Sequence, residues 1–118
     1  MTVAGHRHER VGVEIQQEIS SMLAGELKDP RLTAIATVTE VRVTPDLKQA
    51  KVYVSVQGDE AEQKSALAGL TAAAGFIRRE LSERLLLRRT PELNFVLDRS
   101  EEYGQRIEDL IRQTKIQD

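Results

Sequence analysis

The stretch VRVTPDLKQAKVYVSV, residues 41–56, decides the fold of this chain. Two runs in which apolar and polar residues alternate flank a short turn, and this period of two is typical of strands with one buried face. Within the turn, Pro45 fixes the backbone angle φ and Asp46 can hydrogen-bond to nearby backbone. The stretch therefore predicts an antiparallel hairpin with one apolar face.

The first strand of this hairpin is expected to begin at about Ala34. Its inward residues are Ile35, Val41 and Val43, and its outward residues are Glu40 and Arg42. In the second strand, four residues are expected to point inward: Ala50, Val52, Val54 and Val56. Three are expected to point outward: Lys51, Tyr53 and Ser55. Tyr53 could stack on an RNA base, although covering the strand is the plainer interpretation.

Before the hairpin, apolar residues recur at helical spacing and predict an amphipathic helix over roughly residues 8–27. These residues are Val11, Ile15, Ile19, Met22, Leu23 and Leu27. The sequence LKDPRL, residues 27–32, should end this helix. Pro30 disfavours helical backbone at Asp29 and lacks an N–H donor.

After the hairpin, Asp59 is a candidate cap for a helix that continues to about Leu87. The apolar stripe of this helix is Leu67, Leu70, Ala74, Ile77, Leu81 and Leu85. Pro91 stops the helix, and alternation then resumes in a third strand with Leu93, Phe95 and Leu97 on one side. Ser100 can cap a short last helix with one apolar face, formed by Tyr103, Ile107, Leu110 and Ile111.

Gly75 stands inside the second helix, where glycine costs about 1 kcal/mol relative to alanine. The helical wheel places it beside Arg78 and Arg79, away from the apolar stripe. One interpretation is that Gly75 marks a bend or the boundary of two shorter helices, which would let Ala73 and Ala74 pack closely on the sheet. Another is a patch of bare backbone that lets a nucleic-acid backbone approach the two guanidinium groups. The two interpretations are compatible.

Length and composition indicate one domain, residues 1–118, because 40% hydrophobic residues can fill one modest core. The chain has no cysteine, which excludes disulfides and thiolate chemistry. No apolar run approaches the roughly 20 residues of a membrane span, and the N-terminus lacks the apolar core of a signal peptide. We therefore expect a cytoplasmic protein without a membrane segment.

Charge is unevenly distributed behind the formal net charge of -2. Residues 78–89 carry five arginines against two glutamates, whereas residues 92–118 carry four basic residues against seven acidic ones. Nine basic residues could form one continuous RNA-binding surface: Arg10, Lys28, Arg31, Lys48, Lys51, Arg78, Arg79, Arg88 and Arg89. The alternative is a solvated face of mixed charge.

Catalytic and cofactor motifs are not found. His6 and His8 are two candidate ligands without a third, which makes a poor metal site. The glycines form neither a GxxxxGK[ST] nor a GxGxxG pattern, so nucleotide binding is unsupported. The sequence therefore predicts no enzyme activity, no cofactor and no metal.

Five stretches along nearly the whole chain resemble the bacterial ribosome-binding factor A family: RVGVEIQQEISSML, LKDPRL, VTPDLKQAKVYVSV, AAGFIRREL and TPELNFVLDRS. The resemblance implies an α+β fold of the KH type II kind, with a three-stranded sheet packed against helices in the order α-β-β-α-(kink)-α-β and a short C-terminal helix. Ordinary KH domains clamp nucleic acid with a GxxG loop between two helices. This chain has none, and the family's Ala-x-Gly kink is matched by Ala73, Ala74 and Gly75.

By this resemblance, the chain would bind the free or immature small (30S) ribosomal subunit and its 16S rRNA. It would assist late maturation and 5′-end processing of that rRNA, support growth in the cold, act as a monomer and be released with the help of a ribosome-associated GTPase. An alternative from another class is a KH-like module that binds a protein partner without direct RNA contact, through its acidic C-terminal helix and its other helix faces.

Overall fold

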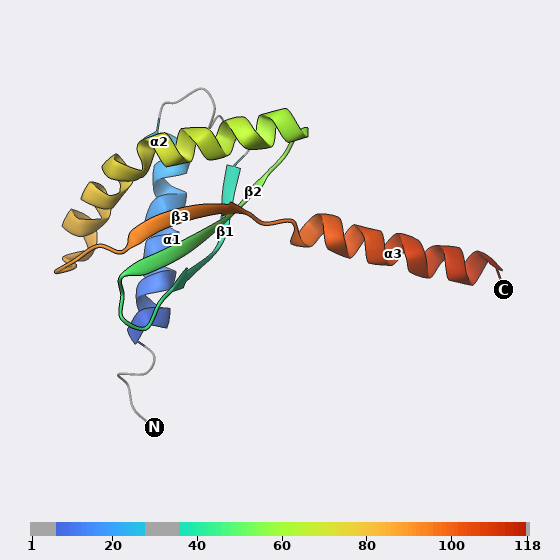
Figure 1. The fold of residues 1–118 in the computed structure, drawn as a ribbon, viewed down its shortest axis with the longest axis horizontal. Coiled ribbons are helices and arrows are strands. Elements are labelled where there is room, and N and C mark those ends of the chain that lie inside the picture. Colours follow the sequence, from blue (N-terminus) through green and yellow to red (C-terminus); the bar gives the residue numbers. More distant parts are fainter. Residues whose placement is uncertain (1–6, 28–35, 118) are drawn as a thin grey trace.

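A computed structural model of the chain describes residues 7–27 and 36–117 (Figure 1). The elements follow in the order α1 (Arg7–Gly25), β1 (Ala36–Val43), β2 (Gln49–Val56), α2 (Glu60–Leu85), β3 (Glu92–Leu97) and α3 (Ser100–Gln117). The predicted helix end at LKDPRL and the predicted inward residue Ile35 fall largely or wholly outside the described residues.

The predicted hairpin is confirmed, because β1 and β2 pair antiparallel with Arg42 opposite Lys51. A register shift between Val38 and Glu40 marks a bulge in β1. The third strand, β3, lies parallel to β2, which makes a mixed sheet of order β1-β2-β3. The α+β architecture predicted from the sequence is therefore present.

The core lies between the sheet and the helices α1 and α2, which pack chiefly on β1 and β3 respectively. All four inward residues predicted for β2 are buried, as are Val41 and Val43 of β1. The helices add fully buried side chains at helical spacing: Ile15, Ile19 and Met22 from α1, and Leu70, Ile77 and Leu81 from α2. Phe95 and Leu97 are half-buried and pack against this core.

A close contact between α1 and β1 depends on Gly12. A Cβ atom at this position would lie 2.7 Å from the backbone oxygen of Val41. Only glycine lets the helix backbone come this near to the strand. The glycine thus sets how closely α1 covers the sheet.

Of the two forms predicted for the second helix, the boundary between two shorter helices is wrong, because α2 is one continuous α-helix over Glu60–Leu85. Figure 1 shows that this helix follows a bent course, with its first and last parts pointing in different directions. Apolar residues on both sides of Gly75, such as Leu70 and Ile77, pack into the same core. This packing outweighs the propensity cost of about 1 kcal/mol for one glycine. Asp59 caps the helix as predicted, in a capping box with Glu62.

The last helix is longer than predicted, since α3 spans 18 residues from Ser100. Three residues of its predicted apolar face are exposed: Ile107, Leu110 and Ile111. Figure 1 shows α3 extending away from the sheet and the other helices. In the described part of the chain, no helix is long and apolar enough to cross a membrane.

Candidate nucleic-acid interface

Four basic residues from three separate segments line one surface hollow, and we call this group the basic end: Arg7, Lys48, Arg88 and Arg89. Asp46, Leu47 and Leu87 complete the lining. The segments are the start of α1, the turn between β1 and β2, and the connection that follows α2. Figure 1 shows these three segments at the same end of the molecule.

The hairpin turn that carries Lys48 is built by local hydrogen bonds. The carboxylate of Asp46 accepts one bond from the Thr44 hydroxyl at 2.6 Å and one from the Lys48 backbone N–H at 3.0 Å. Leu47 adopts the left-handed conformation with φ 62°. The backbone N–H of Glu92 donates to the Lys48 oxygen at 2.9 Å, which ties the turn to the start of β3.

The connection after α2 is shaped by Leu86, which ends the helix in the left-handed conformation with φ 52°. This conformation satisfies the geometry of a helix C-terminus but is unfavourable for leucine. It turns the chain so that Arg88 and Arg89 reach the hollow beside the hairpin turn.

Asp46 is the acidic residue that lines the hollow. The hydrogen bond from Thr44, and then the bond from Lys48, lower the pKa of this carboxyl below its usual value. The carboxylate is therefore occupied in holding the turn. No ion pair between residues of the described ranges neutralises any of the four cations of the basic end. The hollow thus offers four positive charges against one negative charge.

Arg78 is exposed on α2, but its guanidinium group is bound to the connection that follows this helix. Its Nε donates to the Pro91 oxygen at 3.2 Å, and its Nη2 donates to the Thr90 oxygen at 3.1 Å. Both acceptor residues are buried. Because these two residues follow Arg88 and Arg89 directly, Arg78 braces the connection that carries them.

The remaining predicted cations lie elsewhere. Arg10 lies one helical turn after Arg7 and is exposed, and Arg79 is exposed on α2 without a hydrogen-bond or ion-pair partner in the described part of the chain. Lys51 lies on the sheet, opposite Arg42 and beside Asn94 in register. Lys28 and Arg31 lie outside the described residues.

Three of the nine predicted cations are thus brought together, and Arg7 was missed. Arg7 precedes the residue at which the helix was expected to start. Its spacing of three residues from Arg10 is the signal that could have found it, because residues three apart share a helix face.

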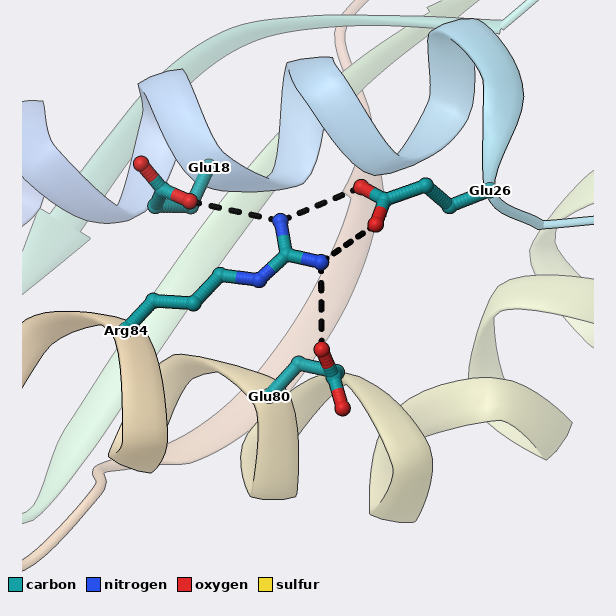
Figure 2. A network of polar contacts seen from close by, with 4 residues as sticks. All are labelled: Glu18, Glu26, Glu80 and Arg84. Carbon is teal, nitrogen blue, oxygen red and sulfur yellow. Dashed lines mark hydrogen bonds and ion pairs between the residues drawn. The ribbon is translucent and has the colours of Figure 1, made fainter.

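Arg84, the remaining arginine of residues 78–89, is neutralised by three carboxylates (Figure 2). Its Nη1 donates to Glu18 at 3.3 Å and to Glu26 at 3.1 Å, and its Nη2 donates to Glu80 at 3.1 Å. Its Nη2 also donates to the second carboxylate oxygen of Glu26. The hydrogen bond from Arg84 lowers the pKa of Glu26 and raises that of Arg84. This arrangement joins α1 to α2 and removes Arg84 from the candidate interface.

Comparison with known proteins identifies relatives over nearly the whole chain. The model of the ribosome-binding factor A family matches residues 7–111. A ribosome-binding factor A of Acetivibrio thermocellus is 54% identical over 111 residues, which is 94% of this chain and 90% of the relative.

Solved structures agree with this similarity. The crystal structure of ribosome-binding factor A from Thermus thermophilus is 28% identical, with a TM-score of 0.67 over 76% of this chain and 94% of that one. A homology model of the Thermus thermophilus factor, fitted into a cryo-EM map of a complex with the 30S subunit, is 28% identical, with a TM-score of 0.62 over 75% of this chain and 91% of that one. The architecture described above is therefore the KH-like α+β fold of these structures.

Proposed function

Because this chain belongs to the ribosome-binding factor A family, we propose that it binds the small (30S) ribosomal subunit. The observation that carries this proposal is the cryo-EM complex of the 30S subunit into which the Thermus thermophilus relative was fitted. The basic end supports it, because an RNA-rich particle presents phosphate groups and this surface presents cations without partners in the described part of the chain. The chain would act as one KH-like RNA-binding domain over residues 1–118.

The basic end would contact the phosphate backbone of 16S rRNA. Arg88, Arg89 and Arg7 can each grip a phosphate with two parallel N–H bonds, and Lys48 adds a point charge. Contacts of this kind recognise the shape and charge of folded RNA and carry little base information. Exposed Arg10 and Arg79 would extend the surface along α1 and α2, and the predicted contacts of Lys28, Arg31 and Lys51 remain part of the proposal.

Gly75 would offer the rRNA a close approach to α2. A Cβ atom at this position would meet nothing within 4 Å, so packing inside the protein does not explain the glycine. Its neighbour on the helix face, Arg79, is exposed. Arg78 would act on RNA only through the connection that it braces, as a positioning residue.

The binding would serve late maturation of the subunit, including 5′-end processing of 16S rRNA and growth in the cold. The factor itself would be a cytoplasmic monomer without catalytic activity, so nucleases would make the cuts on an rRNA that the bound factor has remodelled. A ribosome-associated GTPase would assist its release.

The test is sedimentation of the full chain with purified 30S subunits over a series of salt concentrations. We expect the double substitution Arg88→Glu with Arg89→Glu to weaken binding at least ten-fold and to flatten the salt dependence. The matched control is Arg106→Glu with Arg112→Glu on α3, where the same charges change on exposed positions far from the basic end. If both double variants bind like the unchanged chain, the basic end is not the interface.

A second candidate is a protein-interaction module, which the exposed apolar residues Ile107, Leu110 and Ile111 of α3 favour. In that case, subunit binding would be insensitive to salt and would be lost on substituting Leu110 by Asp. The same sedimentation series separates the two candidates.

A further inference from the structure

The face of the sheet that points away from α1 and α2 carries a second set of side chains, and we call it the open sheet face. Strand register places these side chains in rows across β1, β2 and β3. One row is Arg42, Lys51 and Asn94, and the next row is Glu40, Tyr53 and Val96. In the described ranges, no helix packs on this face.

Arg42 is fixed in place on the open sheet face by two contacts. The carbon of its guanidinium group lies 5.4 Å from the centre of the Tyr53 ring, which is within the range of a cation–π contact. Its Nε forms an ion pair with Glu40. The side chain nevertheless remains 70% exposed. The Arg42 guanidinium group therefore contacts the aromatic ring while most of the side chain remains exposed to solvent.

Arg42 lines a surface hollow together with Gln49, Lys51 and Asn94. Val43, Thr44 and Ala50 complete the lining. The Asn94 Nδ2 donates to the Gln49 Oε1 at 3.2 Å, and the Gln49 Nε2 donates to Glu92 at 3.3 Å. These bonds orient the Asn94 amide and leave its oxygen and its second N–H to a ligand. Lys51 has no ion-pair partner in the described part of the chain.

We propose that the open sheet face binds one unpaired nucleotide of single-stranded RNA. The base stacks on the solvent side of the Arg42 guanidinium, the Asn94 amide hydrogen-bonds to the edge of the base, and Lys51 meets the adjacent phosphate. Bases that have left a duplex are recognised in this way, by stacking on aromatic rings or guanidinium planes and by hydrogen bonds to their edges. The site shares Lys51 with the proposed rRNA contacts, but Arg42 and Asn94 are not among the residues of the basic end, so substitutions at Arg42 and at Arg88 and Arg89 test the two proposals separately.

The charges on this face argue for stacking as the main source of affinity. Glu40 neutralises Arg42, and Glu92 lies at the far end of the amide chain. Lys51 is therefore the cation available to a phosphate on this face. One phosphate contact predicts a slope of about -0.7 for log K against log salt. A surface with four free cations would give a much steeper slope.

The experiment is an NMR titration of the full, ¹⁵N-labelled chain with a mixed-sequence RNA tetranucleotide. We expect the largest shift changes at the amides of residues 42, 51 and 94, at the Asn94 side-chain NH₂ and at the Arg42 Nε–H. A tetranucleotide of the same backbone without bases should not produce them, and a short RNA duplex should produce them only weakly.

Arg42→Lys is the decisive substitution, because it keeps the charge and removes the planar stacking surface. We expect it to weaken tetranucleotide binding about ten-fold, as is typical for the loss of one stacked base. Arg106→Lys on α3 is the matched control and should leave binding unchanged. An Arg42→Lys chain with normal affinity would overturn the proposal, as would shift changes confined to the basic end or equal binding of the abasic RNA.

The result is separable from the 30S proposal. Loss of subunit binding in the basic-end variants with an intact tetranucleotide response supports both proposals. A missing tetranucleotide response with normal subunit binding overturns the inference about the open sheet face alone. If the amides of the open sheet face show no shift change with RNA but do show one when a protein partner is added, the proposed RNA site is wrong and the face binds that partner.

Discussion

Arg84 in α2 grips Glu26, just beyond the end of α1, through both terminal nitrogens of its guanidinium group (Figure 2). Glu18 and Glu80 add one hydrogen bond each to the same group. The two helices belong to different parts of the chain, and both pack on the same face of the sheet. Arg84 therefore fixes how α1 and α2 sit against each other, while three carboxylates depend on it for their charge balance.

Substituting Arg84 by Met should destabilise the fold, because three neighbouring carboxylates lose the cation between them. We expect a thermal midpoint several degrees lower in circular-dichroism melting. The control is Arg106→Met on α3, an exposed position that should melt like the unchanged chain. Equal midpoints for the two variants would mean that the network adds nothing to stability.

The same network predicts a loss of stability in acid. The hydrogen bond from Arg84 lowers the pKa of Glu26 below 4.5 in the folded chain. A lowered folded pKa contributes stability that is present above the ordinary pKa and is lost as the pH falls through the folded value. Urea unfolding followed from pH 7 to pH 3 should therefore lose stability below about pH 4.5, and Glu26→Gln should flatten that fall. An unchanged acid limb in Glu26→Gln would contradict the role of this pair.

The hairpin could be predicted from the sequence because alternation over residues 41–43 and 50–56, on the two sides of the turn, admits one register for the apolar face. The continuity of α2 could not be predicted from the sequence. Gly75 lowers the local helix propensity, and only the packing of residues far apart in the chain outweighs this cost. The basic end was only partly predictable. Arg7 and Arg88 are distant in sequence. They line the same hollow because β3 runs parallel to β2, so the chain must return to the hairpin turn through α2 before β3 begins.

Gly12 and Gly75 should respond in opposite directions to substitution by alanine. Gly12→Ala places a Cβ atom 2.7 Å from a backbone oxygen, so we expect a loss of about 1–3 kcal/mol in the free energy of unfolding. Gly75→Ala meets open space inside a regular helix and should gain up to about 1 kcal/mol. Urea denaturation of the two variants measures both values. A stabilised Gly12→Ala chain would show that α1 can move off β1 at no cost.

Gly75→Ala also tests the proposed approach of RNA to α2, since its fold should be at least as stable as the original. We expect weaker sedimentation with 30S subunits, because the added methyl group separates the RNA backbone from the helix. If this more stable chain binds 30S subunits normally, Gly75 has no role in the contact between RNA and α2.

Substituting Leu86 by glycine should stabilise the fold. It is 88% exposed and holds a left-handed conformation that costs a leucine about 1–2 kcal/mol relative to glycine. Leu86→Gly removes that strain but adds freedom to the unfolded chain, so we expect a net gain of about 0.5 kcal/mol in the free energy of unfolding. Leu86→Ala keeps most of the strain and is the control. A loss of stability with glycine would show that the exposed leucine makes a contact that matters.

Arg78 should affect subunit binding through the connection that it braces, and this distinguishes it from Arg79. Arg78→Lys keeps the charge but cannot hold the Thr90 and Pro91 oxygens with two fixed donors, so we expect a loss of about 1–2 kcal/mol in stability. The amides of residues 87–90 should exchange faster with solvent, and 30S binding should weaken because Arg88 and Arg89 are no longer held in place. Arg79→Lys, with the same charge on an exposed position, should change neither the exchange nor the stability. If Arg78→Lys leaves amide exchange unchanged while subunit binding still falls, Arg78 contacts the RNA directly and the bracing role is wrong.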